Sequence, residues 1–436
     1  MRIIIDVMSG DNAPSELING ALLAAAEFSA CDIVIVGNEN IIKQTAENEK
    51  LDLSPVTIVH ADDVIYMEDK PLCVVREKNN SSMSVGLRLL EKGEGDAFVS
   101  AGNTGALIAG ATLIVRRIRG IQRAAIATVL PLENPTLLMD SGANLVVTDE
   151  NMEQFAKMGS IYMQKIFGIE SPRVGQLNNG TEYNKGLPLQ VDTYKRLSAM
   201  DDINFVGNIE GKTVPLGACD VLVTDGFTGN ILLKLIEGMG KFMLKTMKSL
   251  FMANTLTKIS ALALRGQVKT IKKKFDASEY GGAPLLGISK PVIKAHGSSD
   301  ALAIKNAVKQ AIEFINTGIN IEIAEYSVEF ERRRAEEREL EKNGISATLK
   351  ITENSADNTV QSTHENNAET KINDNTGHTD SDTDGKLAEN KEKNSKDKSK
   401  VNDNKNDIKT KDKDKKTKTK EKSKDKAKKK ANEDKK

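Results

Sequence analysis

Residues 97–105 read AFVSAGNTG and contain the pattern that decides the fold class of this chain. The first four residues form an apolar run that predicts a buried strand. Gly102 and Gly105 then predict a tight loop, and the apolar periodicity of residues 105–119 predicts a helix. A buried strand, a glycine-containing loop and a helix in this order are typical of an α/β protein with a parallel sheet.

The same order of elements recurs along residues 1–314. Further β-branched runs predict strands at 3–6, 32–36, 56–60, 125–129, 137–140, 173–177, 204–207, 221–224 and 292–295. Helical periodicity predicts helices at 14–28, 82–92, 152–167, 228–250 and 300–314. We therefore expect an α/β fold with a doubly wound, largely parallel sheet.

The charge balance separates a core from a tail. The 436 residues carry 62 basic and 62 acidic side chains, but residues 1–352 hold 39 and 43, residues 353–385 hold 1 and 8, and residues 386–436 hold 22 and 11. No aromatic residue follows Phe330. A segment with so few apolar residues cannot offset its ordering entropy by burial. We expect one core domain at 1–345 and a disordered, charged tail at 346–436.

Several features predict a cytoplasmic protein without membrane-spanning segments. Cys31, Cys73 and Cys219 match no metal-ligand spacing, and their odd number argues against a disulfide framework. The apolar run at the N-terminus is too short for a signal peptide. The longest apolar stretch, 107–115, is far shorter than the roughly 20 residues of a transmembrane helix.

Five segments that follow predicted strands combine glycine with small polar side chains. They are DVMSGD at 6–11, SAGNTG at 100–105, DSGAN at 140–144, TDGFTGN at 224–230 and HGSSD at 296–300. Ligands of doubly wound folds bind at the carboxyl ends of strands, and backbone N–H groups at a following helix start attract anions. One such loop is ordinary turn chemistry. Five together predict a site for an anionic ligand that bears phosphate.

Other nucleotide and nucleophile signatures are absent from the sequence. Residues 207–213, GNIEGKT, have three residues between the glycines, where a P-loop has four. No G-x-G-x-x-G follows a predicted strand, and no serine lies in a G-x-S-x-G elbow. Among the histidines, His296 ends the last predicted strand directly before a loop, so it is a candidate for either a structural or a catalytic role.

These loops, together with YGGAPLLG at 280–287, resemble the motifs of the bacterial phosphate acyltransferases, the PlsX family. The resemblance runs in order from residue 1 to about 335. It implies an enzyme that transfers a fatty acyl group from acyl carrier protein to inorganic phosphate and so forms acyl phosphate for phospholipid synthesis. It also implies a fold similar to those of phosphotransacetylases and isopropylmalate dehydrogenase. Ser9 and Asn179 depart from the family pattern, which usually has glycine and an apolar residue there.

The resemblance further implies a cytoplasmic homodimer that associates peripherally with the membrane surface, near the downstream acyl phosphate:glycerol-3-phosphate acyltransferase. We expect no cofactor and no metal, because the carboxylates are scattered singly among the loops. We also expect no specific nucleic-acid partner, since the lysine-rich end of the tail has no aromatic residue to stack on bases. The tail has no counterpart in the common family core.

Site residues follow from these loops as hypotheses. We expect Ser298, Ser299 and the backbone of Gly297 to hold phosphate, with Lys185 or His296 supplying positive charge. No covalent enzyme intermediate is required, because positioning and donors for the oxyanion can supply the acceleration. Hydrogen-bond donors near the thioester are expected from Asn103, Thr104, Asn144 and Asn230, with Asp225 and Asp300 orienting them. The other expected substrate-binding residues are Gly102, Gly105, Asp140, Gly142 and Gly226.

Two further surfaces are predicted outside the pocket. Residues 238–275 alternate apolar and lysine residues at helical spacing, which predicts a helical hairpin with an apolar tip at Leu250, Phe251 and Met252. The hairpin is a dimer interface, a stripe that faces the core or a lipid contact, and dimerisation and lipid contact are compatible. A basic cluster is a candidate docking site for the acidic carrier protein and consists of Arg116, Arg117, Arg119 and Arg123.

Two other functions remain open from the sequence. A short-chain phosphotransacetylase that uses coenzyme A would share the phosphate loops and differ in the thioester donor. A non-catalytic, membrane-associated scaffold would bind acyl phosphate or carrier protein without turnover.

Overall fold

The computed structural model describes residues 1–132, 134–255, 257–258, 261, 264, 266–267 and 281–342. The chain divides into two units, Met1–Thr359 and Val360–Lys436. The second unit lies outside the described residues, as do the whole predicted tail and most of the second arm of the predicted hairpin.

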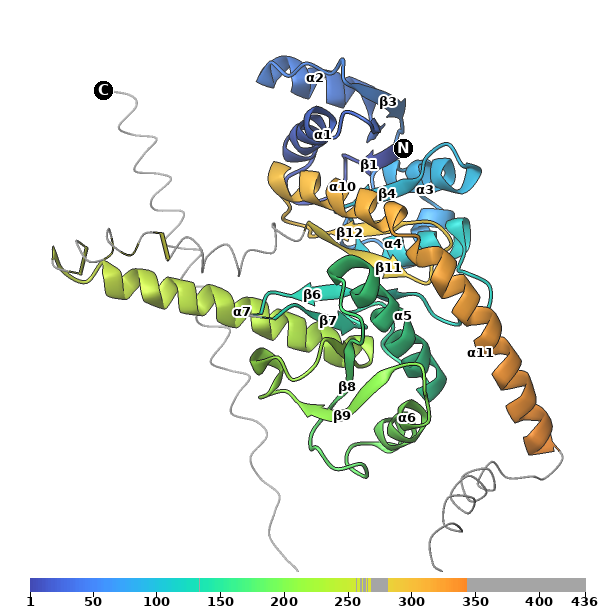
Figure 1. The fold of residues 1–436 in the computed structure, drawn as a ribbon. Helices are drawn as coiled ribbons and strands as arrows, with labels where there is room; N and C mark the ends of the chain where they lie inside the picture. The colour runs from blue at the N-terminus through green and yellow to red at the C-terminus, as the bar shows by residue number, and fades with distance from the viewer. Residues whose placement is uncertain are drawn as a thin grey trace, which may run out of the picture. The chain divides into compact units, whose positions relative to one another are not determined.

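Among the described residues, the first sheet has seven strands in the order β3-β2-β1-β4-β12-β11-β5 (Figure 1). Their bounds are β1 Arg2–Asp6, β2 Asp32–Gly37, β3 Val56–His60, β4 Ala97–Ser100, β5 Ala125–Ile126, β11 Gly282–Leu286 and β12 Val292–Ala295. The pairs β3-β2, β2-β1, β1-β4 and β4-β12 are parallel, whereas β11 is antiparallel to both β12 and β5. The carboxyl ends of β1, β4 and β12 therefore lie side by side.

In the part of the chain that the structure describes, the second sheet has five strands in the order β6-β7-β10-β8-β9. Their bounds are β6 Thr128–Leu130, β7 Thr136–Met139, β8 Arg173–Asn178, β9 Asn204–Glu210 and β10 Val221–Val223. Only the edge strand β6 is antiparallel to its neighbour. Because β5 and β6 are separated by Ala127 alone, the chain passes directly from one sheet to the other at this point.

Helices cover both faces of the first sheet. One face packs on α1 (Ser15–Glu27), α2 (Glu39–Glu49) and α10 (Ala301–Asn316). The other packs on the 3-10 helix Pro71–Val75, α3 (Ser82–Lys92), α4 (Thr104–Gly110) and the π-helical turn Ala111–Val115. Such two-sided cover explains why the strands are continuous apolar runs rather than alternating ones.

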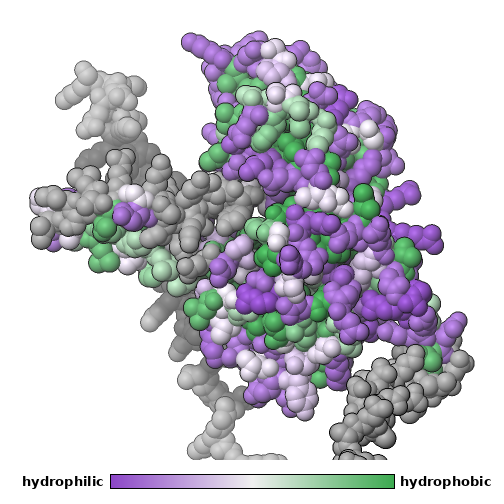
Figure 2. Space-filling model, viewed as in Figure 1, coloured by the Kyte–Doolittle hydropathy of each residue, from purple (hydrophilic) through white to green (hydrophobic). Residues whose placement is uncertain are grey.

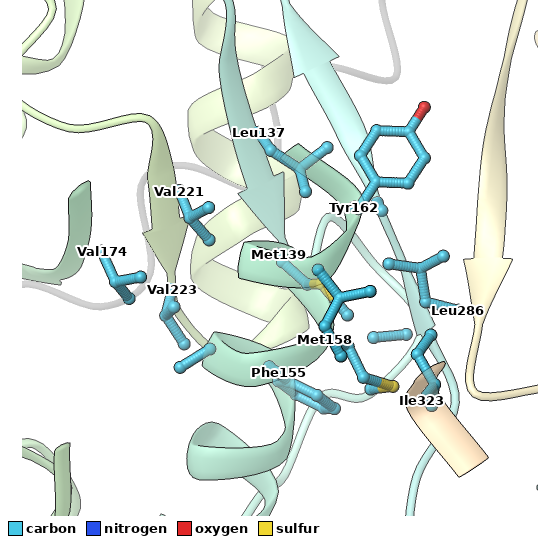
Figure 3. Packing of buried hydrophobic residues seen from close by; sticks show 14 of the residues in the cluster. Leu137, Met139, Phe155, Met158, Tyr162, Val174, Val221, Val223, Leu286 and Ile323 are labelled. Carbon is cyan, nitrogen blue, oxygen red and sulfur yellow. The ribbon is translucent and has the colours of Figure 1, made fainter. Parts of the chain in front are cut away.

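The second sheet is covered in the same way. One face packs on α5 (Asp149–Phe167), α6 (Pro188–Ser198) and α11 (Ile319–Lys342), and Figure 3 shows Phe155, Met158 and Tyr162 of α5 against strand residues. The opposite face packs on the amino-terminal half of α7 (Gly226–Phe251) and on the 3-10 helix Val214–Leu216. Helix α7 continues beyond this contact, where most of its side chains are exposed.

The structure confirms the predicted α/β class with largely parallel strands and corrects several details. The predicted strand 125–129 is two short strands in different sheets. Strand β11 was not predicted, because its Gly282 and Pro284 are typical of a loop. Its antiparallel pairing and the edge position of its short partner β5 accommodate these residues. Helices α2, α6 and α11 were also missed, since their polar composition hides the buried stripe.

Candidate active site

Three loops converge at the carboxyl ends of β1, β4 and β12, and we call residues 6–11, 100–105 and 295–300 the sheet-1 loops. The Asp11 N–H donates to the Gly297 carbonyl at 2.8 Å. The Asn12 side chain donates to the carbonyls of Ser298 and Ser299, both at 3.1 Å. Gly10 has φ +128°, and a Cβ there would lie 3.2 Å from the Gly297 oxygen. The loops predicted to bind one ligand therefore contact one another directly.

A polar row crosses the sheet beneath these loops. Strand pairing places Asp6 opposite Ser100, and Ser100 opposite Lys294. Two residues earlier, the same registers align Ile4, Phe98 and Val292, which belong to one apolar cluster. Side chains two residues apart in a strand share a face. The apolar row thus gives way to a carboxylate, a hydroxyl and an ammonium at the end of the sheet.

Like Ser100, Asp6 is fully buried. Its carboxylate accepts from the Ser100 hydroxyl at 2.8 Å and from the Met8 N–H at 3.2 Å. Burial raises the pKa of Asp6, and the hydroxyls of Ser82, Ser9 and Ser100 oppose that rise. The Ser100 hydroxyl also accepts from the Gly102 N–H at 3.1 Å. Through Ser100, Asp6 therefore helps to hold residues 100–105 in place.

Lys294 is the cation of the row, and sequence reasoning missed it. Its ammonium donates to the carbonyls of Ala101, at 3.3 Å, and Ala295. Burial lowers the pKa of Lys294 to about 8, while the charges of Asp6 and Asp11 oppose that shift. A signal was present in the sequence, because Lys294 interrupts a strand that is otherwise apolar. Lysine is almost never fully buried without a partner.

His296 lies at the exposed end of β12, as predicted. Its Nδ1 is 3.2 Å from the Ser298 backbone nitrogen and 2.9 Å from the Ser298 Oγ. Because a backbone N–H can only donate, Nδ1 accepts, and the proton of the neutral ring lies on Nε2. Burial lowers the pKa of His296, which favours this neutral form. His296 can therefore donate from Nε2 but is a poor source of positive charge at neutral pH.

The start of α10 already holds two carboxylates. Asp300 is the N-cap and accepts from the Ala303 N–H at 2.9 Å. Glu16 accepts from the Ala301 N–H at 2.8 Å. The buried Ser299 hydroxyl, in contrast, has no hydrogen-bond partner among the described residues. An anion in this loop would meet Ser298, Ser299 and Gly297 rather than the first N–H groups of the helix.

Asn103 and Thr104 hold the second loop in place. The Asn103 amide group donates to the carbonyls of Tyr66, Met67 and Asp69 at 3.0–3.2 Å. Its oxygen caps α4 by accepting from the Ala106 N–H at 3.0 Å. Both ends of the amide are thus used within the protein. Thr104 is the first residue of α4 and is partly exposed.

Close contact explains the glycines of this loop and the unusual Ser9. A Cβ at Gly102 would lie 2.7 Å from the Ser9 Cβ, and one at Gly105 would lie 2.9 Å from the Pro71 Cγ. Ser9 is buried, so the side chain that departs from the family pattern is accommodated because residue 102 has none.

A second group of loops follows β7 and β10, and we call residues 140–144 and 224–230 the sheet-2 loops. The buried Asp140 carboxylate accepts from the N–H groups of Gly142, Ala143 and Asn144 at 2.7–3.1 Å and from the Asn144 side chain at 2.9 Å. It also accepts from the Ile126 N–H of β5 at 3.1 Å. Burial raises the pKa of Asp140, and these N–H donors oppose the rise.

The start of α7 packs directly on this carboxylate loop. Asp225 caps the helix by accepting from the Thr228 N–H at 2.9 Å and hydroxyl at 2.7 Å. The Gly226 N–H donates to the Asn144 carbonyl at 2.7 Å. A Cβ at Gly142 would lie 3.6 Å from the Asn230 side chain, so Asn230 borders the same loop. Asp225 and Asn144 therefore have structural bonds that sequence reasoning did not anticipate.

Helix α7 connects the two groups of loops. From the sheet-2 loops it runs on to Lys234, Glu237 and Lys241, whose charges act on the His296 ring. The polar line of α7 that begins at Asn230 thus faces the sheet-1 loops. Lys185 is not in the sheet-1 loops, but the strand before it, β8, runs parallel to β10 and ends beside it, at the edge where the sheet-2 loops lie. Lys185 is exposed in the segment after β8, where its carbonyl accepts from the Asn178 side chain at 3.0 Å.

The contact between α7 and Asp140 can be tested with two glycines of one helix. A Cβ at Gly229 would overlap the Asp140 carbonyl oxygen, whereas Gly238 has no atom within 4 Å of such a Cβ. We expect Gly229→Ala to lower the free energy of unfolding by about 1–3 kcal/mol. The matched change Gly238→Ala should raise it by up to about 1 kcal/mol, because alanine favours the helix. Urea denaturation measures both, and equal effects would show that α7 does not pack on Asp140 in this way.

Comparison with known proteins identifies the family. Residues 1–322 match the family model described as fatty acid synthesis protein. The phosphate acyltransferase of Thermoanaerobacter pseudethanolicus is 47% identical over 320 residues, which are 73% of this chain and 95% of that protein. The phosphate acyltransferase of Clostridioides difficile is 43% identical and covers 76% of this chain and 98% of its own length.

Among solved structures, a phosphotransacetylase from Streptococcus pyogenes aligns with a TM-score of 0.48 and 18% identity. The alignment covers 72% of this chain and 94% of that one. The sequence relatives and the family model agree with the motifs in the loops. The chain therefore belongs to the phosphate acyltransferase (PlsX) family.

Proposed function

We propose that this protein transfers a fatty acyl group from acyl carrier protein to inorganic phosphate, forming acyl phosphate for glycerophospholipid synthesis. Family membership supports acyl transfer to phosphate in phospholipid synthesis. The choice of acyl carrier protein as the acyl donor rests on the family resemblance of the motifs. The observation that carries the proposal is the convergence of glycine-rich loops from two sheets beside one helix, in a chain whose relatives are named phosphate acyltransferases.

The proposed reaction is a direct displacement at the thioester. An oxygen of hydrogen phosphate bonds to the carbonyl carbon, the C–S bond breaks, and the phosphate proton ends on the leaving sulfur. The products are acyl phosphate and the free thiol, so atoms and charge balance without a cofactor. Direct displacement also requires no acyl-enzyme, and the protein contributes by positioning both substrates and stabilising the oxyanion.

The described side chains can position the substrates and stabilise the oxyanion. The Nε2–H of neutral His296 can donate to the developing oxyanion or to phosphate. Ser298 is exposed next to His296, and the Ser299 hydroxyl lacks a partner in the described part of the chain. Asn230 borders the opposite side of the site, at the start of α7. Asp225 caps α7, which carries Asn230, and Asp300 caps α10, the helix that follows the loop with Ser298 and Ser299.

Acyl phosphate formation by the purified full-length chain tests the proposal. We expect turnover with palmitoyl carrier protein and phosphate, and little with acetyl-coenzyme A and phosphate. Equal or better use of acetyl-coenzyme A would instead indicate a phosphotransacetylase, and no acyl phosphate from either donor would indicate a scaffold.

Variants of His296 and Ser298 test the site itself. His296→Ala and Ser298→Ala should each reduce turnover by roughly 10–100-fold, because each removes a donor near the reacting atoms. His60→Ala is the matched control, since the His60 Nδ1 also accepts a backbone N–H, from Glu39 at 3.2 Å. Near-normal rates for both site variants would contradict the assignment.

The basic cluster at the far end of α4 is proposed to dock the carrier protein. Arg116, Arg117, Arg119 and Arg123 are all exposed, and none forms an ion pair with a described residue. The cluster follows twelve helical residues, Thr104 to Val115, or roughly 18 Å of helix from the sheet-1 loops. A carrier protein bound there would have to extend its acyl arm along this helix.

Charge reversal distinguishes docking from a purely local role. We expect Arg117→Glu and Arg119→Glu, made singly, to raise KM for acyl carrier protein severalfold while kcat changes little, because the patch steers an acidic partner. Lys92→Glu, at another exposed cation, should leave KM unchanged. Added salt should raise KM for the wild type and reduce the difference. An unchanged KM in both arginine variants would exclude docking at this cluster.

Helix α7 carries a line of exposed apolar side chains beyond the core. Phe227, Ile231, Leu235 and Phe242 are 54–62% exposed, and their spacing places them on one side of the helix. Figure 2 shows hydrophobic colour along α7, at the left of the view. We propose that this side pairs with a second copy of the chain in a homodimer, as the family resemblance implies.

The end of α7 is proposed to contact the membrane surface. Leu250 and Met252 are 63% and 56% exposed, and Lys241, Lys245 and Lys248 are exposed on the preceding turns. Apolar side chains beside lysines suit an interface with anionic lipid. No helix in the described ranges is long and apolar enough to cross a membrane. We propose that this end of α7 attaches the protein peripherally to the cytoplasmic side of the membrane, as the family resemblance implies.

Flotation with vesicles that contain anionic lipid tests this contact. Leu250→Glu with Phe251→Glu should abolish flotation, because carboxylates would enter the lipid interface. Leu250→Glu with Met252→Glu should do the same and changes only exposed side chains. Leu216→Glu, at a residue that is 79% exposed elsewhere on the surface, is the control and should float normally. Unchanged flotation of both double variants would refute the membrane contact.

A further inference from the structure

None of the residues predicted by sequence places a cation within the sheet-1 loops. Lys185 is exposed in the loop after β8, at the edge where the sheet-2 loops lie. His296 accepts a backbone N–H at Nδ1, which describes a neutral ring. The Asp300 and Glu16 carboxylates already occupy the start of α10. A dianionic phosphate held by the sheet-1 loops would be stabilised by a cation in these loops that sequence reasoning did not name.

Lys294 is such a cation. Its ammonium donates to the carbonyl of Ala101, the first residue after β4. A Cβ at Gly10 would lie 3.7 Å from the same carbonyl and 3.2 Å from the Gly297 oxygen. All three sheet-1 loops therefore pass close to this lysine. The Lys294 residue is only partly buried, whereas its neighbour Asp6 is fully enclosed.

The bonds of Lys294 leave it with capacity for a ligand. An ammonium has three N–H donors, and two of them go to the carbonyls of Ala101 and Ala295. The charged groups that act on it are Asp6 of β1 and Asp11 of the following loop, and Lys294 in turn acts on His296. No ion pair with Lys294 is present in the described part of the chain. Asp6 is instead bonded to Ser100 and Met8.

We propose that the Lys294 ammonium binds the substrate phosphate directly and is a cation of the catalytic site. This inference rests on the proposed function, since it names the residue that receives phosphate in that reaction. Asp6 and Ser100, next to it in the register, act as positioning residues that hold the ammonium and the Gly102 loop together. The Ser299 hydroxyl, buried and without a described partner, supplies a neutral donor to the same anion.

Substitution of Lys294 tests the proposal with phosphate as the varied substrate. We expect Lys294→Met to raise KM for phosphate by about 10–100-fold, the range for loss of a charge-assisted hydrogen bond. KM for the acyl donor should stay within about twofold of the wild type, since that substrate is held elsewhere. Lys290→Met is the matched control. Lys290 also donates to two carbonyls, of Leu90 at 2.7 Å and Glu91 at 3.3 Å, but lies before β12 at its other end.

The pH profile provides a readout that a structural lysine would not change. Burial lowers the pKa of Lys294 to about 8, so the ammonium loses its charge as pH rises through that value. In the wild type, kcat/KM for phosphate should therefore fall above pH about 8. Lys294→Arg keeps its charge to much higher pH, and the decline should move upward in that variant.

Direct binding separates this proposal from the proposed function. Equilibrium dialysis with radiolabelled inorganic phosphate should show weaker binding in Lys294→Met than in the wild type and Lys290→Met. If the wild type makes acyl phosphate but Lys294→Met has unchanged phosphate affinity and KM, the role of Lys294 is refuted and the function stands. If no acyl phosphate forms but phosphate binding depends on Lys294, the function fails and the site remains. If Lys294→Met does not fold, Lys294→Arg and the wild-type pH profile decide, and an unmoved decline overturns the proposal.

Discussion

The buried carboxylate of Asp140 is the interaction on which the arrangement of the two sheets depends. It accepts from Ile126 in the first sheet and from the loop that follows β7 in the second. A buried carboxylate requires several donors to remain favourable, and here the backbone supplies most of them. Because Gly226 and Gly229 lack side chains, α7 can begin directly on this loop. One acidic residue thus positions the strand junction, the second group of loops and the helix that crosses the site.

The row Asp6, Ser100 and Lys294 has a comparable role in the first sheet. Its members come from strands that are adjacent in space but distant in sequence, and strand register alone brings them together. The two buried networks differ in chemistry. Asp140 is surrounded by N–H donors, with no cation of the described residues acting on it, whereas Asp6 lies near an ammonium. Asp140 therefore organises the fold, whereas Asp6, in our proposal, supports an anion site.

The sequence predicted which loops lie together more accurately than it predicted the hydrogen-bond partners of their side chains. The loops after β1, β4 and β12 contact one another as expected, because parallel strands end at one edge. However, Asn103 and Asn144, predicted as donors to substrate, use their amides within the protein. Asn103 in particular bonds three carbonyls of residues 66–69, a segment more than thirty residues away. Local sequence gives no information about such a partner.

The sequence by itself determined the α/β class, the order of most strands and helices, and the loops that carry chemistry. These follow from local patterns, since the period of apolar residues and the positions of glycine act over a few residues. Only the tertiary structure decided which side chains remain free for a ligand. It placed Lys294 among the sheet-1 loops and Lys185 at the edge of the sheet-2 loops, because strand order and register depend on packing between distant segments rather than on neighbours in the chain.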